Sequence, residues 1–228
     1  MIDNIGEAFG YVFKDSRWPS KIGIGALFLL LSFFLVGIPF LLGYMVWITR
    51  NVIRKEPYPL PEWICLGQMF LTGLKLLACY LMFLIPLWII VLVPFWLVSF
   101  SVIMSGNWFG IPWLGILYLI IVLGSICYAV FWPSIYLRFV MTDSIGATFS
   151  IKEIWGFTKK NIYIVILTIL LTYVAALIAG AGAMILFIGI FFTYPYGLMI
   201  AANLLGKLKL QADKDAASSA PAVKSSGQ

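Results

Sequence analysis

Few residues of this chain have side chains suited to acid–base, nucleophilic or metal chemistry. The chain has no histidine, and its three cysteines, Cys65, Cys79 and Cys127, show no CxxC spacing. Zinc and haem sites usually need clustered cysteine and histidine ligands. We therefore expect no metal ion and no cofactor, and we expect the cysteines to pack as small apolar side chains.

Catalytic motifs are also missing from the sequence. It contains no G-x-S-x-G, H-E-x-x-H, Walker or dinucleotide-binding glycine pattern. An enzyme would need ionisable groups that converge at the cytoplasmic interface, for example Glu62, Asp143 and Arg138. We predict no catalytic residues and a protein that is not an enzyme.

Polar side chains do occur inside the apolar segments. In lipid, such groups usually form hydrogen bonds between helices, which contribute about 0.6 to 2 kcal/mol each. Asn203 is the most demanding, because a buried amide needs partners for both donors and acceptors. We predict that Asn203 makes an interhelical polar contact. The hydroxyl residues in these segments include Ser32, Ser99, Ser101, Ser125, Thr168, Thr172 and Thr193.

The elements that position these residues are long apolar stretches. All 15 Lys and Arg and all 9 Asp and Glu residues lie outside Ile22 to Thr49, Leu76 to Leu137 and Asn161 to Gly206. A charge at the bilayer centre costs about 2.5 to 3.5 kcal/mol on insertion scales, so this pattern is typical of a polytopic membrane protein. The composition, 63% apolar and 11% charged, agrees, because soluble domains have about 45–50% and about 25%.

The formal net charge is +6. Its cations are spread beside apolar segments and form no patch with stacking aromatic residues, so we expect no binding of nucleic acid. Cytoplasmic anchoring and contact with anionic lipid explain the charge better.

The second and third stretches each predict two helical spans, because about 20 residues cross the hydrocarbon core. The first stretch is ambiguous: it forms one helix kinked at Pro39, or two short spans that turn at Gly37 to Pro39. The hairpin gives six segments with every charge on one side, which the positive-inside rule makes cytoplasmic. Five segments are the alternative.

We predict an all-α protein, a polytopic transmembrane helix bundle. One integral membrane domain is expected over residues 1–210, followed by a disordered polar tail over residues 211–228. The predicted segments are about 22–36, 39–54, 76–104, 113–137, 162–180 and 184–205.

Three stretches near the charges predict short interfacial helices. In the first, Phe9, Val12 and Phe13 share one face at helical spacing. Ser150 to Glu153 has capping-box spacing, and Leu60 to Trp63 has a proline at a helix start. The predicted anchors in the headgroup boundary are Phe9, Phe13, Trp18, Trp63 and Trp155.

Several motifs also follow one another in a familiar order. They are Phe9-Gly10-Tyr11-Val12-Phe13-Lys14-Asp15, Trp18, Lys21 to Gly25, Gly43-Tyr44, Arg50 to Arg54, Leu60-Pro61-Glu62-Trp63 and Gly73-Leu74-Lys75. This series resembles the integral membrane family catalogued as domain of unknown function 4013, over roughly residues 5 to 210. Leu-Pro-Glu-Trp is its most specific part.

The chain departs from that family at Ile64-Cys65-Leu66, where relatives often have acidic residues. We expect this change to place the third interfacial helix deeper in the membrane. The resemblance implies a multi-pass membrane protein with no assigned activity, so it supplies no catalytic residues.

The sequence predicts a non-enzymatic protein that organises the membrane, or serves as an interaction subunit, by binding lipid or another membrane protein. The alternative is a transporter or channel for an uncharged or lipid-like molecule. A cavity lined by polar residues of several spans would favour transport, and a filled bundle interior would favour the organising role. Small residues at Ala175 to Ala179 and Gly182 to Gly189 suit close packing within the last hairpin or in a homo-oligomer. The expected location is the cell membrane, with both termini cytoplasmic.

Overall fold

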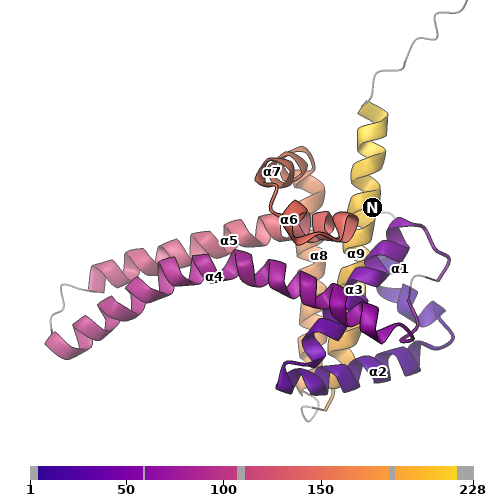
Figure 1. Cartoon of the computed structure of the whole chain (residues 1–228), viewed down its shortest axis with the longest axis horizontal. Coiled ribbons are helices and arrows are strands. Elements are labelled where there is room, and N and C mark those ends of the chain that lie inside the picture. Colours follow the sequence, from indigo (N-terminus) through magenta and orange to yellow (C-terminus); the bar gives the residue numbers. More distant parts are fainter. Residues whose placement is uncertain (1–4, 59, 107–110, 185–187, 220–228) are drawn as a thin grey trace, which may run out of the picture.

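The computed structural model describes residues 5–58, 60–106, 111–184 and 188–219, and the regular structure in these ranges is helical (Figure 1). The predicted all-α class is therefore confirmed. The longer helices are α2 (Trp18–Leu31), α3 (Gly37–Ile53), α4 (Leu66–Ser105), α5 (Ile111–Thr142), α8 (Ile162–Ala181) and α9 (Ile190–Ser219). The shorter elements are α1 (Ile5–Gly10), α6 (Ile145–Thr148) and α7 (Ile151–Lys160), with the 3-10 turns η2 (Tyr11–Lys14), η3 (Ser32–Phe34) and η5 (Gly182–Met184).

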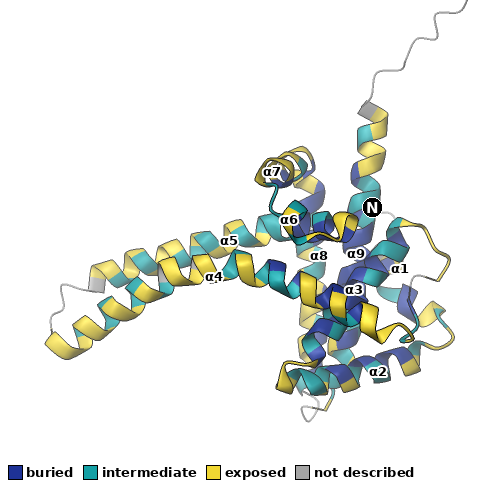
Figure 2. Cartoon of the chain, viewed as in Figure 1, coloured by how far each residue is buried: buried dark blue, intermediate teal, exposed yellow. Residues whose placement is uncertain are grey.

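The helices form a packed body and a long arm. In the body, α8 and α9 pack against each other, while α3 contacts both α9 and α4, and α2 lies against α9. Helices α4 and α5 leave the body together and project from it as a hairpin (Figure 1). Figure 2 shows that buried residues concentrate in the body and that the hairpin is exposed along most of its length.

Three helical segments of the described chain are long and apolar enough to cross a membrane. They are Leu66–Ser105, Pro112–Thr142 and Ile162–Ala181. Two other apolar segments, Trp18–Phe34 and Gly37–Ile53, are shorter. The helices are thus compatible with a membrane location.

The first apolar stretch folds as two helices joined by η3. The turn ends at Leu35, whose φ of 65° lies in the left-handed region. A Cβ at Gly37 would lie 1.8 Å from the carbonyl oxygen of Phe28, so the turn requires glycine there. Pro39 lies in the first turn of α3, where its missing N–H removes no helix hydrogen bond.

Helices α3 and α4 approach each other at two glycines. A Cβ at Gly43 would lie 1.9 Å from the carbonyl oxygen of Met69, and one at Gly73 would lie 1.7 Å from that of Pro39. Small residues allow this backbone contact, which replaces the hydrophobic driving force that lipid removes. The contact fixes the position from which α4 leaves the body.

A buried threonine links three helices at the centre of the body. The Oγ1 atom of Thr49 on α3 lies 2.8 Å from the hydroxyl oxygen of Tyr136 on α5 and 3.0 Å from the carbonyl oxygen of Ala202 on α9. Apolar side chains fill the space around this contact. The largest fully buried ones include Tyr44, Phe139, Ile48, Met69, Leu76, Met199, Ile200, Leu204 and Leu205.

The predicted hydrogen bonds between helices form only in part. Thr193 on α9 donates to the carbonyl oxygen of Ala179 on α8 at 2.6 Å. Ser99, Ser125 and Thr168 instead donate to the carbonyl oxygens four residues earlier in their own helices, so the prediction is wrong for them. A hydroxyl on a helix can form its hydrogen bond to this carbonyl oxygen and so needs no partner on a neighbouring helix.

The predicted interfacial helices also differ in detail. Helix α7 forms where expected, but the Ser150 side chain makes no capping bond, and Glu153 pairs with Arg138 of α5. No helix begins at Leu60: the chain is irregular through Cys65, and α4 then runs without a break from Leu66. The third predicted interfacial helix is therefore wrong, because the segment contributes to the body.

The polar tail was predicted to be disordered from residue 211. Helix α9 instead continues to Ser219. Pairs four residues apart support it, with Lys209 bound to Asp213 and the Gln211 amide donating to Asp215 at 2.9 Å. Residues 220–228 lie outside the described residues.

The glycine contact predicts a position-specific effect of alanine. Gly73→Ala should lower the free energy of unfolding by about 1 to 3 kcal/mol, because the methyl group overlaps the Pro39 backbone. Gly67→Ala is the control on the same helix, since its Cβ meets no atom within 4 Å. It should be neutral or slightly stabilising. Thermal unfolding in detergent measures both, and equal melting temperatures would contradict the contact.

Candidate functional site

The N-terminal segment turns at Asp15 before α2 begins. The backbone N–H of Arg17 donates to Asp15 Oδ1 at 2.8 Å, and the N–H of Trp18 donates to the Asp15 carbonyl oxygen at 3.2 Å. Pro19 lies in the first turn of α2, where proline is tolerated. These local bonds direct the Asp15 carboxylate toward α2.

The ammonium group of Lys21 on α2 is buried inside the protein. Its Nζ donates to Asp15 Oδ2 at 2.7 Å and to the Leu60 carbonyl oxygen at 2.8 Å. Glu62 Oε1 lies 3.0 Å from the same nitrogen, and only 4% of the Lys21 side chain is exposed. Each of the three ammonium hydrogens therefore has an acceptor.

The electrostatics of Asp15 follow from this arrangement. Burial raises the pKa of its carboxyl, but the hydrogen bonds from Lys21 and from the Arg17 N–H lower the pKa by more. The net pKa lies below its ordinary value, so the carboxylate stays ionised beside the buried ammonium.

Trp63 closes over this ion cluster. Its ring stacks on Tyr44 with centroids 4.0 Å apart, and its Nε1 donates to the Lys21 carbonyl oxygen at 3.2 Å. The Tyr44 hydroxyl in turn donates to the carbonyl oxygen of Pro61 at 3.2 Å. Trp63 was predicted as a headgroup anchor, but its ring packs on another side chain of the body and its N–H donates to the backbone.

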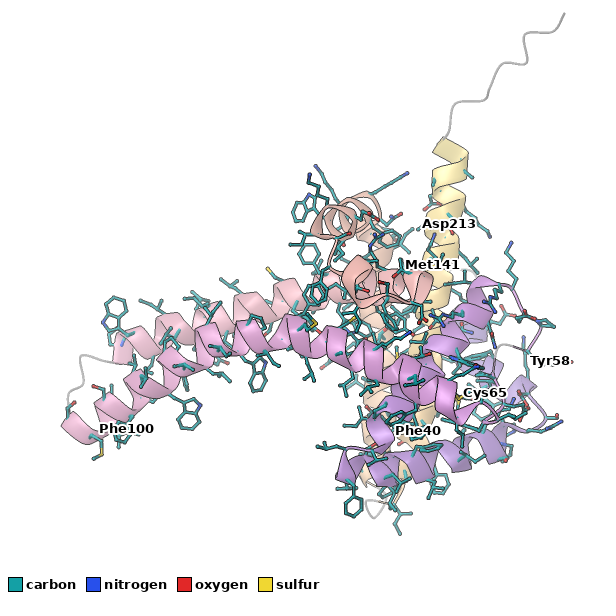
Figure 3. All side chains as sticks on the ribbon, in the orientation of Figure 1. Phe40, Tyr58, Cys65, Phe100, Met141 and Asp213 are labelled. Atoms are coloured by element: carbon teal, nitrogen blue, oxygen red, sulfur yellow. The ribbon has the colours of Figure 1, made fainter. Side chains whose placement is uncertain are left out.

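A cavity of about 410 Å³ lies beside the cluster. Three parts of the chain bound it: the N-terminal segment, helix α9, and the loop that follows α3. Tyr58, labelled in Figure 3, lies on this loop. The cavity lining contains both acidic and basic residues. The lining residues are Glu7, Tyr11, Lys14, Asp15, Val52, Lys55, Glu56, Pro57, Tyr58, Leu60, Asn203, Lys207 and Leu210.

Asn203 lines this cavity and is 4% exposed. Its Oδ1 has no hydrogen-bond partner among the residues that the structure describes. The interhelical polar contact of Asn203 stays a prediction, because this observation concerns only one atom of its amide.

Hydrogen bonds and burial also shift the pKa of other polar groups that line the cavity. Tyr11 donates its hydroxyl to the Met199 carbonyl oxygen at 2.7 Å, and burial raises its pKa well above the ordinary value. Burial lowers the pKa of Lys207, whose Nζ lies 4.0 Å from Glu7, and the Glu7 carboxylate opposes this shift. The hydrogen bond from Lys14 lowers the pKa of Glu7.

The remaining predicted anchors lie in two places. Phe13 is exposed, and its ring contacts Trp18 and Tyr196 with centroids 5.1 and 5.3 Å apart. Phe9 is half-buried against α9, where its carbonyl oxygen accepts from Tyr196 at 2.8 Å. Trp155 on α7 is exposed and lies near Phe131, at a centroid distance of 5.7 Å.

Glu62, Asp143 and Arg138 are not brought together. Glu62 belongs to the Lys21 cluster, and Arg138 pairs with Glu153. Asp143 accepts from Arg50 at 2.9 Å and from Lys75 at 3.3 Å. Burial raises the pKa of Asp143, but these two cations lower it by more. Each of the three residues thus belongs to a different ion pair or cluster.

Sequence reasoning missed the roles of Lys21 and of the cavity. Lys21 directly precedes an apolar stretch, where a lysine usually extends to the headgroups. No local pattern distinguishes that role from burial, because Glu62 and Leu60 reach Lys21 only in the folded chain.

Comparison with family models matches residues 26–199 to the family described as "Protein of unknown function (DUF4013)". The chain belongs to this family. Comparisons with curated proteins and with solved structures found no match. The DUF4013 match contains Tyr44, the segment Leu60 to Trp63 and both close-packed glycines of α3 and α4, while Lys21 and Asn203 lie outside it.

The Lys21 cluster predicts a large loss of stability when the ammonium is removed. Lys21→Met should lower the free energy of unfolding by about 3 kcal/mol, because it leaves the Asp15 carboxylate buried without its partner. The control is Lys14→Met, which removes an exposed ion pair to Glu7 and should change little. Thermal unfolding in detergent compares them. Equal losses would mean that the Lys21 charge does not support the fold.

Proposed function

We propose that this protein is a non-enzymatic multi-pass membrane protein that organises its surroundings by binding lipid. The surface of the α4–α5 hairpin supports this proposal. Ile90, Trp96 and Ile103 on α4 are 71%, 69% and 76% exposed. Figure 3 shows side chains projecting from the hairpin with no other element beside them, Phe100 among them. Such a surface is unstable in water.

The exposed residues point to several sides of α4. Successive residues of an α-helix turn by about 100°, so Trp88, Ile90 and Val93, all exposed, face different directions. A protein partner covers one side of a helix, whereas lipid surrounds it. Lipid is therefore the occupant that this surface fits best.

The length of the hairpin adds a physical effect on the bilayer. From Leu76 to Ser105, α4 carries no charge, and at 1.5 Å per residue this part is about 45 Å long. The hydrocarbon core is about 30 Å thick. A longer apolar segment is accommodated by tilting, by bending or by local thickening of the bilayer. Pro86 and Pro94 lie inside α4, where they favour bending.

The body supports an organising role over transport. Its interior is filled by apolar side chains, and its charged residues pair at helix ends, as Arg50 does with Asp143. A transport route through the body would need to displace this packing.

The native cysteines provide a test of the proposal. Cys127 on α5 and Cys65 before α4 are exposed, whereas Cys79 is buried. A nitroxide on Cys127 in reconstituted vesicles should collide readily with oxygen and rarely with a water-soluble nickel chelate. On Cys65 the preference should reverse, and Cys79 should resist labelling.

Two outcomes would overturn the proposal. Collision of the Cys127 label with the nickel chelate would place the hairpin in water. Shielding of Cys127 from both reagents in native membranes, but not after reconstitution, would indicate that a protein partner covers it.

The topology gives a separate prediction for cysteines introduced into a cysteine-free background. Phe33, Ser105 and Gly180 are exposed positions near the three turns opposite the charges, and Ser20 is exposed on the charged side. With six crossings and cytoplasmic termini, the first three should react with an impermeant thiol reagent applied to intact cells. Ser20→Cys should react only after lysis. Its labelling in intact cells would favour five crossings.

A further inference from the structure

The charged ends of α3, α4 and α5 meet at one carboxylate. Arg50 is the first charged residue after the apolar stretch that ends at Thr49, and Lys75 directly precedes the stretch that begins at Leu76. Asp143, just after α5, lies 2.9 Å from Arg50 Nη2 and 3.3 Å from Lys75 Nζ. Cations of two helices are thus brought together where three apolar segments become charged.

A cavity of about 340 Å³ lies at this place, and we call it the basic pocket. Its volume is in the range of small-ligand sites. Its lining combines charged and apolar side chains. The lining residues are Arg50, Ile53, Arg54, Val140, Met141 and Asp143. Met141, labelled in Figure 3, is 55% exposed. The basic pocket therefore offers both charged and apolar groups to one occupant.

Positive charge exceeds negative charge at the basic pocket. Arg50 and Arg54 line it, and Lys75 joins them through Asp143, the one acidic residue in the described lining. Arg54 is exposed and forms no ion pair with a described residue. The cavity beside the Lys21 cluster differs, because its lining has three basic and three acidic residues. The excess of cations at the basic pocket favours an anionic occupant.

The two arginines have the geometry to bind such an anion. Arg50 donates from Nε to the Val140 carbonyl oxygen at 3.0 Å and from Nη2 to Asp143, which leaves other donors of its guanidinium for a ligand. Arg54 follows Arg50 by four residues at the end of α3, so the two Cβ atoms lie about 5 to 6 Å apart on one face. Guanidinium groups match the oxygens of a phosphate.

The apolar part of the lining favours a lipid over a soluble anion. A phospholipid carries apolar chains next to its phosphate, so it can contact Met141 and Ile53 together with the arginines. Charged helix ends beside apolar spans also lie at the level of the lipid headgroups. We propose that the basic pocket binds the phosphate of an anionic phospholipid, with Arg50 and Arg54 as its donors. This assignment rests on the proposed function.

The test compares two lipids that differ in net charge. Phosphatidylglycerol and phosphatidylcholine share the phosphate and can carry identical acyl chains, but the choline group cancels the phosphate charge. The full chain is reconstituted into vesicles with equal amounts of the two, extracted in mild detergent and analysed by native mass spectrometry. Retained phosphatidylglycerol should exceed phosphatidylcholine by roughly fivefold or more, which is the gain from one close charge pair even at the dielectric constant of water.

Two variants with the same change in net charge assign this preference to the basic pocket. Arg54→Gln should reduce the retention of phosphatidylglycerol by about fivefold. Lys160→Gln is the matched control, because Lys160 is also an exposed cation at a helix end but does not line the basic pocket. It should keep the preference. Melting curves without added lipid should coincide for the two variants, since neither cation pairs with a described residue.

Inorganic phosphate separates the lipid from a soluble anion. It should raise the melting temperature in detergent less than short-chain phosphatidylglycerol does. An equal rise that Arg54→Gln abolishes would overturn the lipid assignment in favour of a soluble anion.

Two further results would overturn the proposal. Equal losses of phosphatidylglycerol in both variants would mean that net charge alone attracts the lipid. Equal retention of the two lipids by the unchanged protein would leave the arginines with the stabilisation of the end of α3. The Cys127 measurement does not depend on headgroup charge, so either failure would leave the hairpin proposal standing.

Discussion

An ammonium group removed from water loses several kcal/mol of hydration unless hydrogen-bonded partners replace it, and Lys21 meets this requirement with acceptors distant in sequence. Asp15 comes from the turn before α2, while Leu60 and Glu62 come from the loop after α3. The two loops must therefore meet over the start of α2. Once they meet, Trp63 stacks on Tyr44 and closes the site, and the same loops form two walls of the cavity whose third wall is α9.

The position of α3 depends on packing that only small residues permit. Gly43 and Gly73 bring the backbones of α3 and α4 into contact, and Thr49 links α3 to α5 and α9 on another side. Because both contacts lie near the body, the outer parts of α4 and α5 receive no further support from it. The hairpin is thus held at its base, and its apolar surface remains exposed.

The sequence predicted the apolar helices well, because a missing charge over twenty or more residues has few explanations other than lipid. It predicted side-chain roles less well. Trp63 has the composition of a headgroup anchor, yet it stacks in the body, since which aromatic residues face lipid depends on distant contacts. Asn203 has the composition of a helix-linking amide, but its Oδ1 has no hydrogen-bond partner among the described residues. The helix beyond residue 211 was missed because local pairs outweighed a polar composition.

The hairpin and the cavity present different chemistry. The hairpin offers apolar side chains without charge, which suit acyl chains. The cavity is instead lined by Lys207 of α9 and by acidic residues of the N-terminal segment and of the loop after α3. They lie on different parts of the protein. Contacts with acyl chains at the hairpin cannot distinguish headgroups. On the proposed function, the hairpin therefore acts through its length and its apolar surface, to which a surrounding bilayer would adjust.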